Sequence, residues 1–390
     1  MEFQKTNLGE LSVNGKGSYG IAASAVPYSD ELFTYLRITD INDDGTLNKS
    51  GLMSVSDEKA EQYLLKPNDI VFARTGGSTG RSYFYDGTDG EFVYAGFLIK
   101  FSIDSTKVNP RFIKYYCLSQ EYRGWVHSFN TGSTRGNINA QTYANMPILL
   151  PSREQQDLLV DTLSVIDEKI KLNTAINENL LEQLHLLYLR IFCDSAMDTP
   201  LGDVGATTSG GTPSRKHDEY YSDSSICWVK SKELLGNYIH ETEEHINDLA
   251  VKKSSAKLLP EHSVLIAMYG ATVGAYGVIS KPMTCNQAVC ALLCNQDYPY
   301  TYLFQIAYES QQKLINLAVG SAQQNISQVL IKQLNLHSDL DIIQKFHNLA
   351  FPIHKEIESL QAENIRLSTL RYNLLPKLMN GEIDVSAVKI

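Results

Sequence analysis

The longest regular pattern in the chain is a helical run without glycine or proline between Pro151 and Asp194. Its hydrophobic residues recur at alternating steps of four and three, the spacing of a coiled-coil seam. Eight of the ten seam positions are apolar: Leu159, Leu163, Ile166, Ile170, Asn173, Asn177, Leu180, Leu184, Leu187 and Ile191. The pattern predicts a helix of about 40 residues, which at 1.5 Å per residue spans about 60 Å.

A second seam of the same kind lies near the end of the chain, at Ile353, Ile357, Leu360, Asn364, Leu367, Arg371, Leu374 and Leu378. Asn177 and Asn364 occupy equivalent positions, and a polar residue in a seam is best known as a device that fixes register and partner. We expect the two helices to pair antiparallel through Ile170, Asn177, Leu180, Leu184, Ile357, Asn364 and Leu367. The alternative is that each helix packs only on its own globular domain. Pro352 predicts either a kink or a late start of the second helix.

The segments between the helices carry short apolar, aromatic and β-branched runs bounded by glycine turns, such as residues 69–73 and 97–101. These runs predict strands, and the segments therefore read as mixed α+β domains. Residues 263–280 contain no charge over 18 positions, close to the length of a membrane helix. Gly270, Gly274 and Gly277 divide this run into strand, turn and strand, so we expect no membrane segment.

The two halves of the chain repeat each other in order. Residues 8–11 match 201–204 and residues 28–30 match 221–223, both at an offset of 193, and Tyr35-Leu36-Arg37 aligns with Trp228-Val229-Lys230. Residues 65–80 match 259–274 at an offset of 194, and residues 132–138 match 320–326 at an offset of 188. Blocks in the same order indicate duplication rather than chance similarity of loops. The predicted fold is α+β: two similar mixed α/β domains, each followed by a long helix, with the helices pairing as an antiparallel coiled coil of pseudo-two-fold symmetry.

The predicted boundaries are a first domain over 1–151, a central helix and linker over 152–198, a second domain over 199–338, and a helix and tail over 339–390. The chain starts without an apolar signal peptide or an Arg-rich transit segment. Six cysteines without a CxxC pair are typical of reduced thiols. We therefore expect a cytoplasmic protein.

Several sequence motifs of catalytic sites are absent or incomplete. The only Gly-Lys pair, Gly15-Lys16, is not followed by Ser or Thr, so no phosphate-binding P-loop is present. The two histidines of His240–His245 are one residue too far apart for a zinc-protease helix, and a solvated acidic loop is the better interpretation. Gly76–Gly80 fits a nucleophile elbow, but the sequence after it is typical of a strand rather than a helix. We expect no catalytic residue, no metal and no cofactor.

Two polar glycine loops remain, residues 74–81 and 131–137. Small residues allow a backbone to approach a ligand, and Arg, Asn and hydroxyl groups can contact phosphates or base edges. The alternative is that these are tight hairpin turns of ordinary polarity. The formal charge of -10 and the pI near 5.4 argue against nucleic acid for the chain as a whole.

Charge by segment resolves this conflict. Residues 61–153 hold ten basic and seven acidic side chains, a net of +3, whereas residues 154–198 hold three basic and nine acidic ones, a net of -6. The acidity therefore lies largely on the central helix. That helix is better suited to protein than to DNA, and the domain beside it can still bind phosphate.

The order of blocks resembles the specificity (S) subunit of type I restriction-modification enzymes over essentially the whole chain. The resemblance is carried by Tyr35–Ile41, Leu259–Gly274, Asn286–Cys290, and Gly132–Arg135 leading to Pro147–Pro151. It implies that each globular part is a target recognition domain reading one half of a split, asymmetric site in double-stranded DNA. Ala322-Gln323-Gln324 replaces Thr134-Arg135-Gly136 in the second copy, which suits two domains that read different sequences.

The resemblance further implies that the helices set the spacer and dock two methylation (M) subunits, with restriction and translocation (R) subunits joining through the complex. The chain itself would do no chemistry. The expected DNA contacts are Arg74, Ser78, Thr79, Arg81, Arg135, Asn137, Lys230, Lys232, Thr272, Gln323 and Gln324. The rival function is a helical protein-protein adaptor without DNA specificity.

Overall fold

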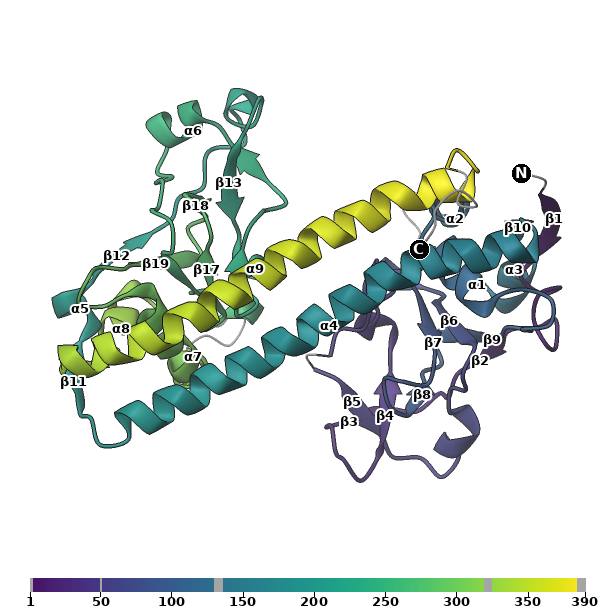
Figure 1. Cartoon of the computed structure of the whole chain (residues 1–390), viewed down its shortest axis with the longest axis horizontal. Coiled ribbons are helices and arrows are strands. Elements are labelled where there is room, and N and C mark those ends of the chain that lie inside the picture. Colours follow the sequence, from purple (N-terminus) through teal and green to yellow (C-terminus); the bar gives the residue numbers. More distant parts are fainter. Residues whose placement is uncertain (1–2, 50, 130–135, 319–324, 384–390) are drawn as a thin grey trace. The chain divides into compact units, whose positions relative to one another are not determined.

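A computed structural model describes residues 3–49, 51–129, 136–318 and 325–383. The chain forms two compact units, unit 1 over residues 1–169 and 367–390, and unit 2 over residues 170–366. Two 40-residue helices, α4 (Arg153–Phe192) and α9 (Leu340–Met379), each contribute one part to both units (Figure 1). The division between the units therefore falls inside the helices.

Unit 1 contains two four-stranded sheets. The first has the strand order β2-β9-β6-β7, and the second has the order β3-β5-β4-β8 with β4 and β8 parallel. A separate antiparallel pair joins β1 to β10. The strands are β1 (Gln4–Asn7), β2 (Ser18–Tyr19), β3 (Ala25–Val26), β4 (Phe33–Leu36), β5 (Met53–Val55), β6 (Asp69–Ala73), β7 (Ser82–Tyr85), β8 (Phe92–Tyr94), β9 (Leu98–Ser102) and β10 (Pro147–Leu150). The short helices are α1 (Pro110–Tyr116), α2 (Gln120–His127) and α3 (Ala140–Ala144), with 3-10 turns η1 (Ile38–Asp40), η2 (Ala60–Tyr63) and η3 (Gly76–Ser78).

Unit 2 contains a five-stranded sheet of order β12-β19-β16-β17-β14, a three-stranded sheet of order β15-β13-β18, and the pair β11-β20. The strands are β11 (Met197–Pro200), β12 (Ala206–Ser209), β13 (Ile226–Val229), β14 (Asn237–Ile239), β15 (His245–Ile246), β16 (Val264–Ala267), β17 (Tyr276–Ile279), β18 (Thr284–Cys285), β19 (Val289–Leu293) and β20 (Asn335–His337). The helices are α5 (Leu201–Val204), α6 (Asp248–Lys253), α7 (Tyr300–Leu317) and α8 (Gln328–Lys332), with 3-10 turns η4 (Asp218–Tyr220), η5 (Ser231–Glu233) and η6 (Gly270–Thr272).

The two units repeat one topology, which confirms the predicted duplication. In each unit a central strand, β6 or β16, pairs antiparallel with the next strand and with a later one, β7 and β9 or β17 and β19. Parallel pairing of β4 with β8 corresponds to parallel pairing of β13 with β18. Both central strands are completely buried, because their apolar residues face packed layers on both sides. Unit 2 differs by adding β14 parallel to β17.

The charge-free run at residues 263–280 forms β16, the turn η6 and β17, as its glycines predict. No helix in the described part of the chain is both long enough and apolar enough to cross a membrane.

The helices pair within unit 2 and also pack on its globular part. Asn173 Nδ2 donates to Asn364 Oδ1 at 2.9 Å, while the ring centroids of Phe192 and Phe346 lie 5.7 Å apart. Along the contact, residue numbers increase on α4 from 173 to 192 while they decrease on α9 from 364 to 346. The two helices are therefore antiparallel, as predicted. Leu184 and Ile357 are fully buried in the core that these helices share with the five-stranded sheet. Leu180 packs against this core, while Ile170, Asn364 and Leu367 are half-buried.

A proline inside α9 does not delay the helix. Helix α9 begins at Leu340, well before Pro352, so the predicted late start is wrong. Asn177 is buried as its seam position predicts, but it does not pair with Asn364. Its Oδ1 has no hydrogen-bond partner in the described part of the chain, and Asn364 bonds to Asn173 instead. The antiparallel register brings nonequivalent seam positions together, which the repeat alone does not reveal.

In unit 1 the helices meet through charge. Asp167 of α4 accepts hydrogen bonds from Arg371 Nη1 of α9 at 2.7 Å, from Lys114 Nζ at 2.6 Å and from the Tyr115 hydroxyl at 2.9 Å. This cluster explains why an arginine occupies the apolar seam of the second helix. Burial acts against the charge on Asp167, but Lys114 and Arg371 lower the pKa of Asp167 below its usual value.

Candidate nucleic-acid interface

The first glycine loop of unit 1 is joined to the end of the second, at Gly136 and Asn137. The turn η3 follows β6 directly, and an isolated bridge pairs Thr75 with Asn137 of the second loop. The amide of Ile138 donates to Arg74 O at 2.9 Å, and Thr79 Oγ1 donates to Gly76 O at 2.8 Å and to Gly136 O at 3.0 Å. Residues 74–81 and the described end of the second loop, Gly136 and Asn137, therefore form a single polar edge after β6.

Unit 2 repeats this construction. The turn η6 follows β16, Tyr269 pairs with Asn325 in an isolated bridge, and the amide of Ile326 donates to Met268 O at 2.9 Å. Gly80 and Gly274 close the two turns with φ angles of 88° and 80°, which a residue with a side chain adopts only under strain. The two repeats therefore share the backbone conformation of this loop, while the side chains that it carries can differ between them.

Two arginines flank the loop of unit 1. The Arg74 guanidinium lies over the Tyr19 ring at 5.1 Å from its centroid, and its buried Nε has no hydrogen-bond partner among the described residues. Arg81 Nε donates to Asp43 Oδ1 at 2.7 Å, and Arg81 Nη1 donates to Ile41 O at 3.0 Å. Arg74 thus keeps an N–H group that can donate to a phosphate or a base, whereas Arg81 would first have to share or release the highly exposed carboxylate of Asp43.

The other candidates of this loop differ in their access to a ligand. Asn137 is exposed and Ser78 is buried. The hydroxyl of Thr79 is engaged by the carbonyl of Gly76 in its own turn and by the carbonyl of Gly136 in the second loop. β7 follows the loop, so the strand-turn-helix geometry of a nucleophile elbow does not form at Ser78. Thr272 is half-buried and donates to Tyr269 O at 3.2 Å. Arg135, Gln323 and Gln324 lie outside the described residues.

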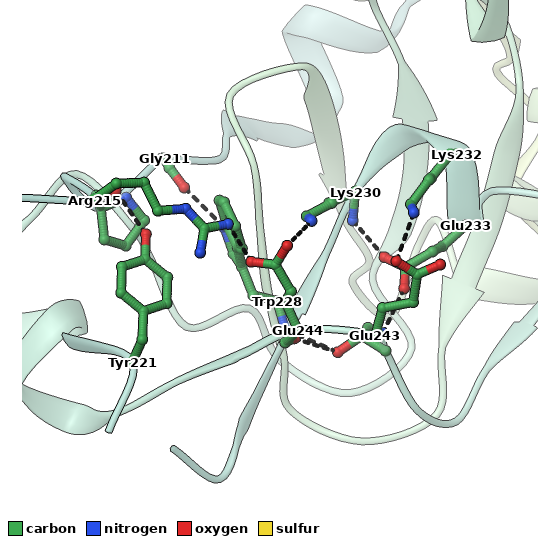
Figure 2. Close-up of polar contacts among 11 residues, drawn as sticks. Gly211, Arg215, Tyr221, Trp228, Lys230, Lys232, Glu233, Glu243 and Glu244 are labelled. Atoms are coloured by element: carbon green, nitrogen blue, oxygen red, sulfur yellow. Dashed lines mark hydrogen bonds and ion pairs between the residues drawn. The ribbon is translucent and has the colours of Figure 1, made fainter. Parts of the chain in front are cut away.

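Lys230 and Lys232 lie together at the end of β13, and each is held by an acidic partner (Figure 2). Lys230 Nζ forms an ion pair with Glu244, and Lys232 Nζ contacts Glu243 Oε2 at 2.5 Å. Glu244 also binds Arg215, so one carboxylate bridges two cations. Hydrogen bonds from Lys230 and then from Arg215 lower the pKa of Glu244.

An aromatic wall supports these cations. The Arg215 guanidinium lies over the Tyr221 ring at 4.3 Å and near the Trp228 ring at 5.4 Å, and Lys230 Nζ lies 5.6 Å from the Trp228 centroid. Trp228 is fixed by its Nε1, which donates to Gly211 O at 3.0 Å (Figure 2). Sequence reasoning missed Arg215, although the basic run Arg215-Lys216-His217 in a Pro- and Ser-containing loop was a signal for it.

Arg37 is the second residue that sequence reasoning missed, and the repeat pointed to it. Arg37 precedes η1 and binds Asp40 through its backbone amide at 2.8 Å and through its Nη2 at 2.7 Å. Lys230 precedes η5 in the same way, and its amide donates to Glu233 Oε2 at 2.7 Å. The aligned basic residues of the two repeats thus occupy the same place after β4 and β13.

Comparison with known proteins assigns the family. The family model described as "Type I restriction modification DNA specificity domain" matches residues 6–182 and again residues 196–338. The specificity subunit of type I restriction enzyme HindI from Haemophilus influenzae is 22% identical over 403 residues, which cover 82% of this chain and 87% of that protein. The MjaIX specificity subunit from Methanocaldococcus jannaschii is 24% identical and covers 71% of this chain and 70% of its own length.

A solved structure agrees in fold. The S subunit of a type I restriction-modification system from M. genitalium matches with a TM-score of 0.54 at 14% identity, over 97% of this chain and 96% of that one. No match supports the alternative of a helical adaptor. The two family-model matches cover most of the chain and fall on the two repeats, and the chain belongs to the family of type I restriction-modification specificity subunits.

Proposed function

We propose that this chain reads a split, asymmetric sequence in double-stranded DNA, with one half-site for each globular domain. The main support is that the two units share the same loop backbone, with the same hydrogen bonds, but carry different side chains on it. Arg74 and Arg81 of unit 1 correspond to Met268 and Ala275 of unit 2, because the same backbone hydrogen bonds hold each pair. Two loops with the same backbone and different side chains suit two half-sites of different sequence.

The cations of unit 2 come from another place in the domain. Arg215, Lys230 and Lys232 are already oriented by carboxylates and by the aromatic wall. Phosphate oxygens accept the same kind of hydrogen bond as carboxylate oxygens, so DNA could replace Glu243 and Glu244 without a rearrangement of the lysines. We assign phosphate contact to the lysines and base or phosphate contact to Arg215.

The two long helices are proposed to dock methylation subunits, which carry the chemistry, and restriction subunits join through that complex. Support comes from exposed apolar side chains on α4: Val165 and Leu172 are each 55% exposed and Ile176 is 37% exposed. Their steps of seven and four place them along one side of the helix. The repeat-equivalent positions on α9 are Pro352, Ser359 and Glu363. We therefore expect two methylation subunits that bind with different affinities.

The test is coexpression of the chain with its methylation subunit, followed by a map of modified bases in the host genome. We expect one bipartite, non-palindromic motif with a fixed gap. A palindromic motif, or no motif in the presence of a complex that forms, would contradict the proposal.

A second experiment tests the helices as the spacer. Seven residues inserted into both helices at the level of Asn173 and Asn364 preserve the seam and add about 10 Å. At 3.4 Å per base pair we expect the gap to grow by about three base pairs, with both half-sites unchanged. An unchanged gap would refute the spacer role.

A further inference from the structure

Three side chains with metal-binding atoms meet beside the cation cluster of unit 2. Cys227 lies on β13, His245 lies on β15, and the two residues are direct partners in the antiparallel register. Glu241 lies in the loop that precedes β15. The Cys227 thiol, one Glu241 carboxylate oxygen and one His245 ring nitrogen all lie within 4.8 Å of one another. Among the described residues no other such group of three occurs.

The Glu241 carboxylate divides its two oxygens between different neighbours. Oε1 accepts from Cys227 Sγ at 3.0 Å and lies 2.5 Å from His245 Nε2. Oε2 accepts from Lys281 Nζ at 3.2 Å. One oxygen is thus directed into the cluster, while the lysine holds the other from outside, which is the arrangement of an outer partner that orients a metal ligand.

We propose that Cys227, Glu241 and His245 bind a Zn²⁺ ion, with a water molecule or another ligand in the fourth position. One thiolate, one imidazole and one carboxylate form a donor set that zinc accepts in tetrahedral geometry. Ligand distances of about 2.0–2.3 Å require the three donor atoms to separate by less than about 1 Å from their present contacts. Glu241 is exposed, so its side chain can make that movement.

The buried thiol is the ligand that needs help to ionise. Burial raises the pKa of Cys227, and hydrogen bonding to Glu241 raises it further. A bound cation would reverse this balance, because a metal stabilises the thiolate directly. Lys281 contributes a second positive charge close to the thiol.

The position of the site gives it a structural role. β15 has two residues, and the three-stranded sheet to which it belongs is built from short strands. A strand of two residues makes few hydrogen bonds to its neighbour, so β15 adds little stability of its own. The same loop carries Glu243 and Glu244, which hold Lys232, Lys230 and Arg215. A metal bound to Glu241 and His245 would hold this loop at both ends. It would thereby also fix the positions of Arg215, Lys230 and Lys232.

Sequence reasoning expected no metal because it considered the two histidines of residues 240–245 on a helix. The segment is a loop followed by a strand, and His240 is not part of the cluster. The missing ligand is Cys227, which lies 14 residues before Glu241 and reaches it only through strand pairing.

The test uses the purified full chain, treated with a chelator and then titrated with Co²⁺ and with Zn²⁺. We expect one equivalent of Zn²⁺ by calorimetry, and a thiolate-to-cobalt absorption band that Zn²⁺ removes by competition. Cys227→Ser should abolish the band. Glu241→Gln, an exposed change that keeps the size of the side chain, should weaken Zn²⁺ binding at least tenfold while the circular dichroism spectrum stays the same.

Two matched controls separate this site from adventitious binding. Cys193→Ser removes an exposed thiol, and His217→Asn removes a histidine that is paired with Glu219 in the same unit. Both variants should bind Zn²⁺ like the unaltered chain. The proposal is overturned if neither ion binds stoichiometrically, if the band persists in Cys227→Ser, or if a control variant loses it.

Discussion

The two units hold the same pair of helices by different means. In unit 1 a half-buried ion cluster joins them, with Asp167 binding Arg371 and Lys114. In unit 2 aromatic packing of Phe192 on Phe346 is combined with the amide pair of Asn173 and Asn364. The backbone repeat therefore fixes which helices meet but not the chemistry of the contact. The two units should therefore unfold under different conditions. Each contains one tryptophan whose fluorescence reports on its unfolding, Trp125 in unit 1 and Trp228 in unit 2.

The largest effect is expected in unit 1. Asp167→Ala leaves Arg371 and Lys114 without their carboxylate in a largely buried place, which should cost about 3–5 kcal/mol of unfolding free energy. The measurement is urea unfolding followed by Trp125 fluorescence in a Trp228→Phe background.

Arg153→Ala is the control for that loss. Arg153 forms an exposed pair with Asp157 on α4 within unit 1, and its removal should cost less than about 1 kcal/mol. If Asp167→Ala costs no more than Arg153→Ala, the ion cluster does not hold unit 1 together.

Acid should destabilise unit 2 before unit 1. Burial lowers the pKa of His354 from 6.5 to about 3, so this histidine is neutral in the fold and protonated in the unfolded chain below pH 6.5. Its contribution to stability is complete above pH 6.5 and falls by about 1.4 kcal/mol per pH unit below it, or about 2 kcal/mol by pH 5. Burial also lowers the pKa values of His240, His337 and His347, which act in the same direction.

Unit 1 should resist the same change. The lowered pKa of Asp167 gives stability that is present above the ordinary carboxyl value near 4 and lost only at lower pH. Thermal unfolding at pH 7 and pH 5, read from Trp228 or Trp125 in single-tryptophan variants, compares the units. His354→Gln can still bond to Tyr238 and should reduce the acid loss of unit 2. Equal losses in both units would contradict the comparison.

A third effect concerns DNA. Arg74→Ala and Lys230→Ala should each weaken cognate binding about tenfold, or about 1.4 kcal/mol, through different half-sites. Binding is measured with duplexes in which one or the other half-site is scrambled, at fixed salt concentration. Lys355→Ala removes the same charge from α9 and should leave affinity unchanged. The assignment of one domain to each half-site is wrong if both variants affect the same half-site.

The smallest effect is expected at the amide pair. Asn173→Leu leaves the Asn364 amide without this partner and should cost about 1 kcal/mol, measured through Trp228 fluorescence. The double variant with Asn364→Leu should recover that loss or exceed the original stability, since an apolar pair suits a seam. A purely additive double variant would show that the two amides do not interact.

The spacing of apolar residues along the sequence was enough to predict the long helices of this protein. The spacing of apolar residues located α4 almost to the residue, since a helix repeats its own geometry every few positions. For α9 the sequence left two starts open, one near residue 339 and one near Pro352, because a proline in a helix admits two interpretations; the helix begins at Leu340.

The loops were predictable in a weaker sense. Glycines and repeat alignment located the polar edges at residues 74–81 and 268–275, and their duplicated hydrogen bonds show why both sets of glycines are needed. The exposure of Asn137 and the burial of Ser78 were not predictable, since both residues look equally polar in the sequence. Side-chain access depends on the neighbours that a fold brings together.

The sequence by itself determined the duplication, the α+β class, the two long helices and the family, because all of these depend on order and spacing along one chain. The tertiary structure decided which groups meet. Arg371 binds Asp167 across a separation of 204 residues, Lys230 binds Glu244, and Cys227 meets Glu241 and His245. Such pairs arise from strand register and antiparallel packing, and these bring together residues whose separation in the chain carries no signal.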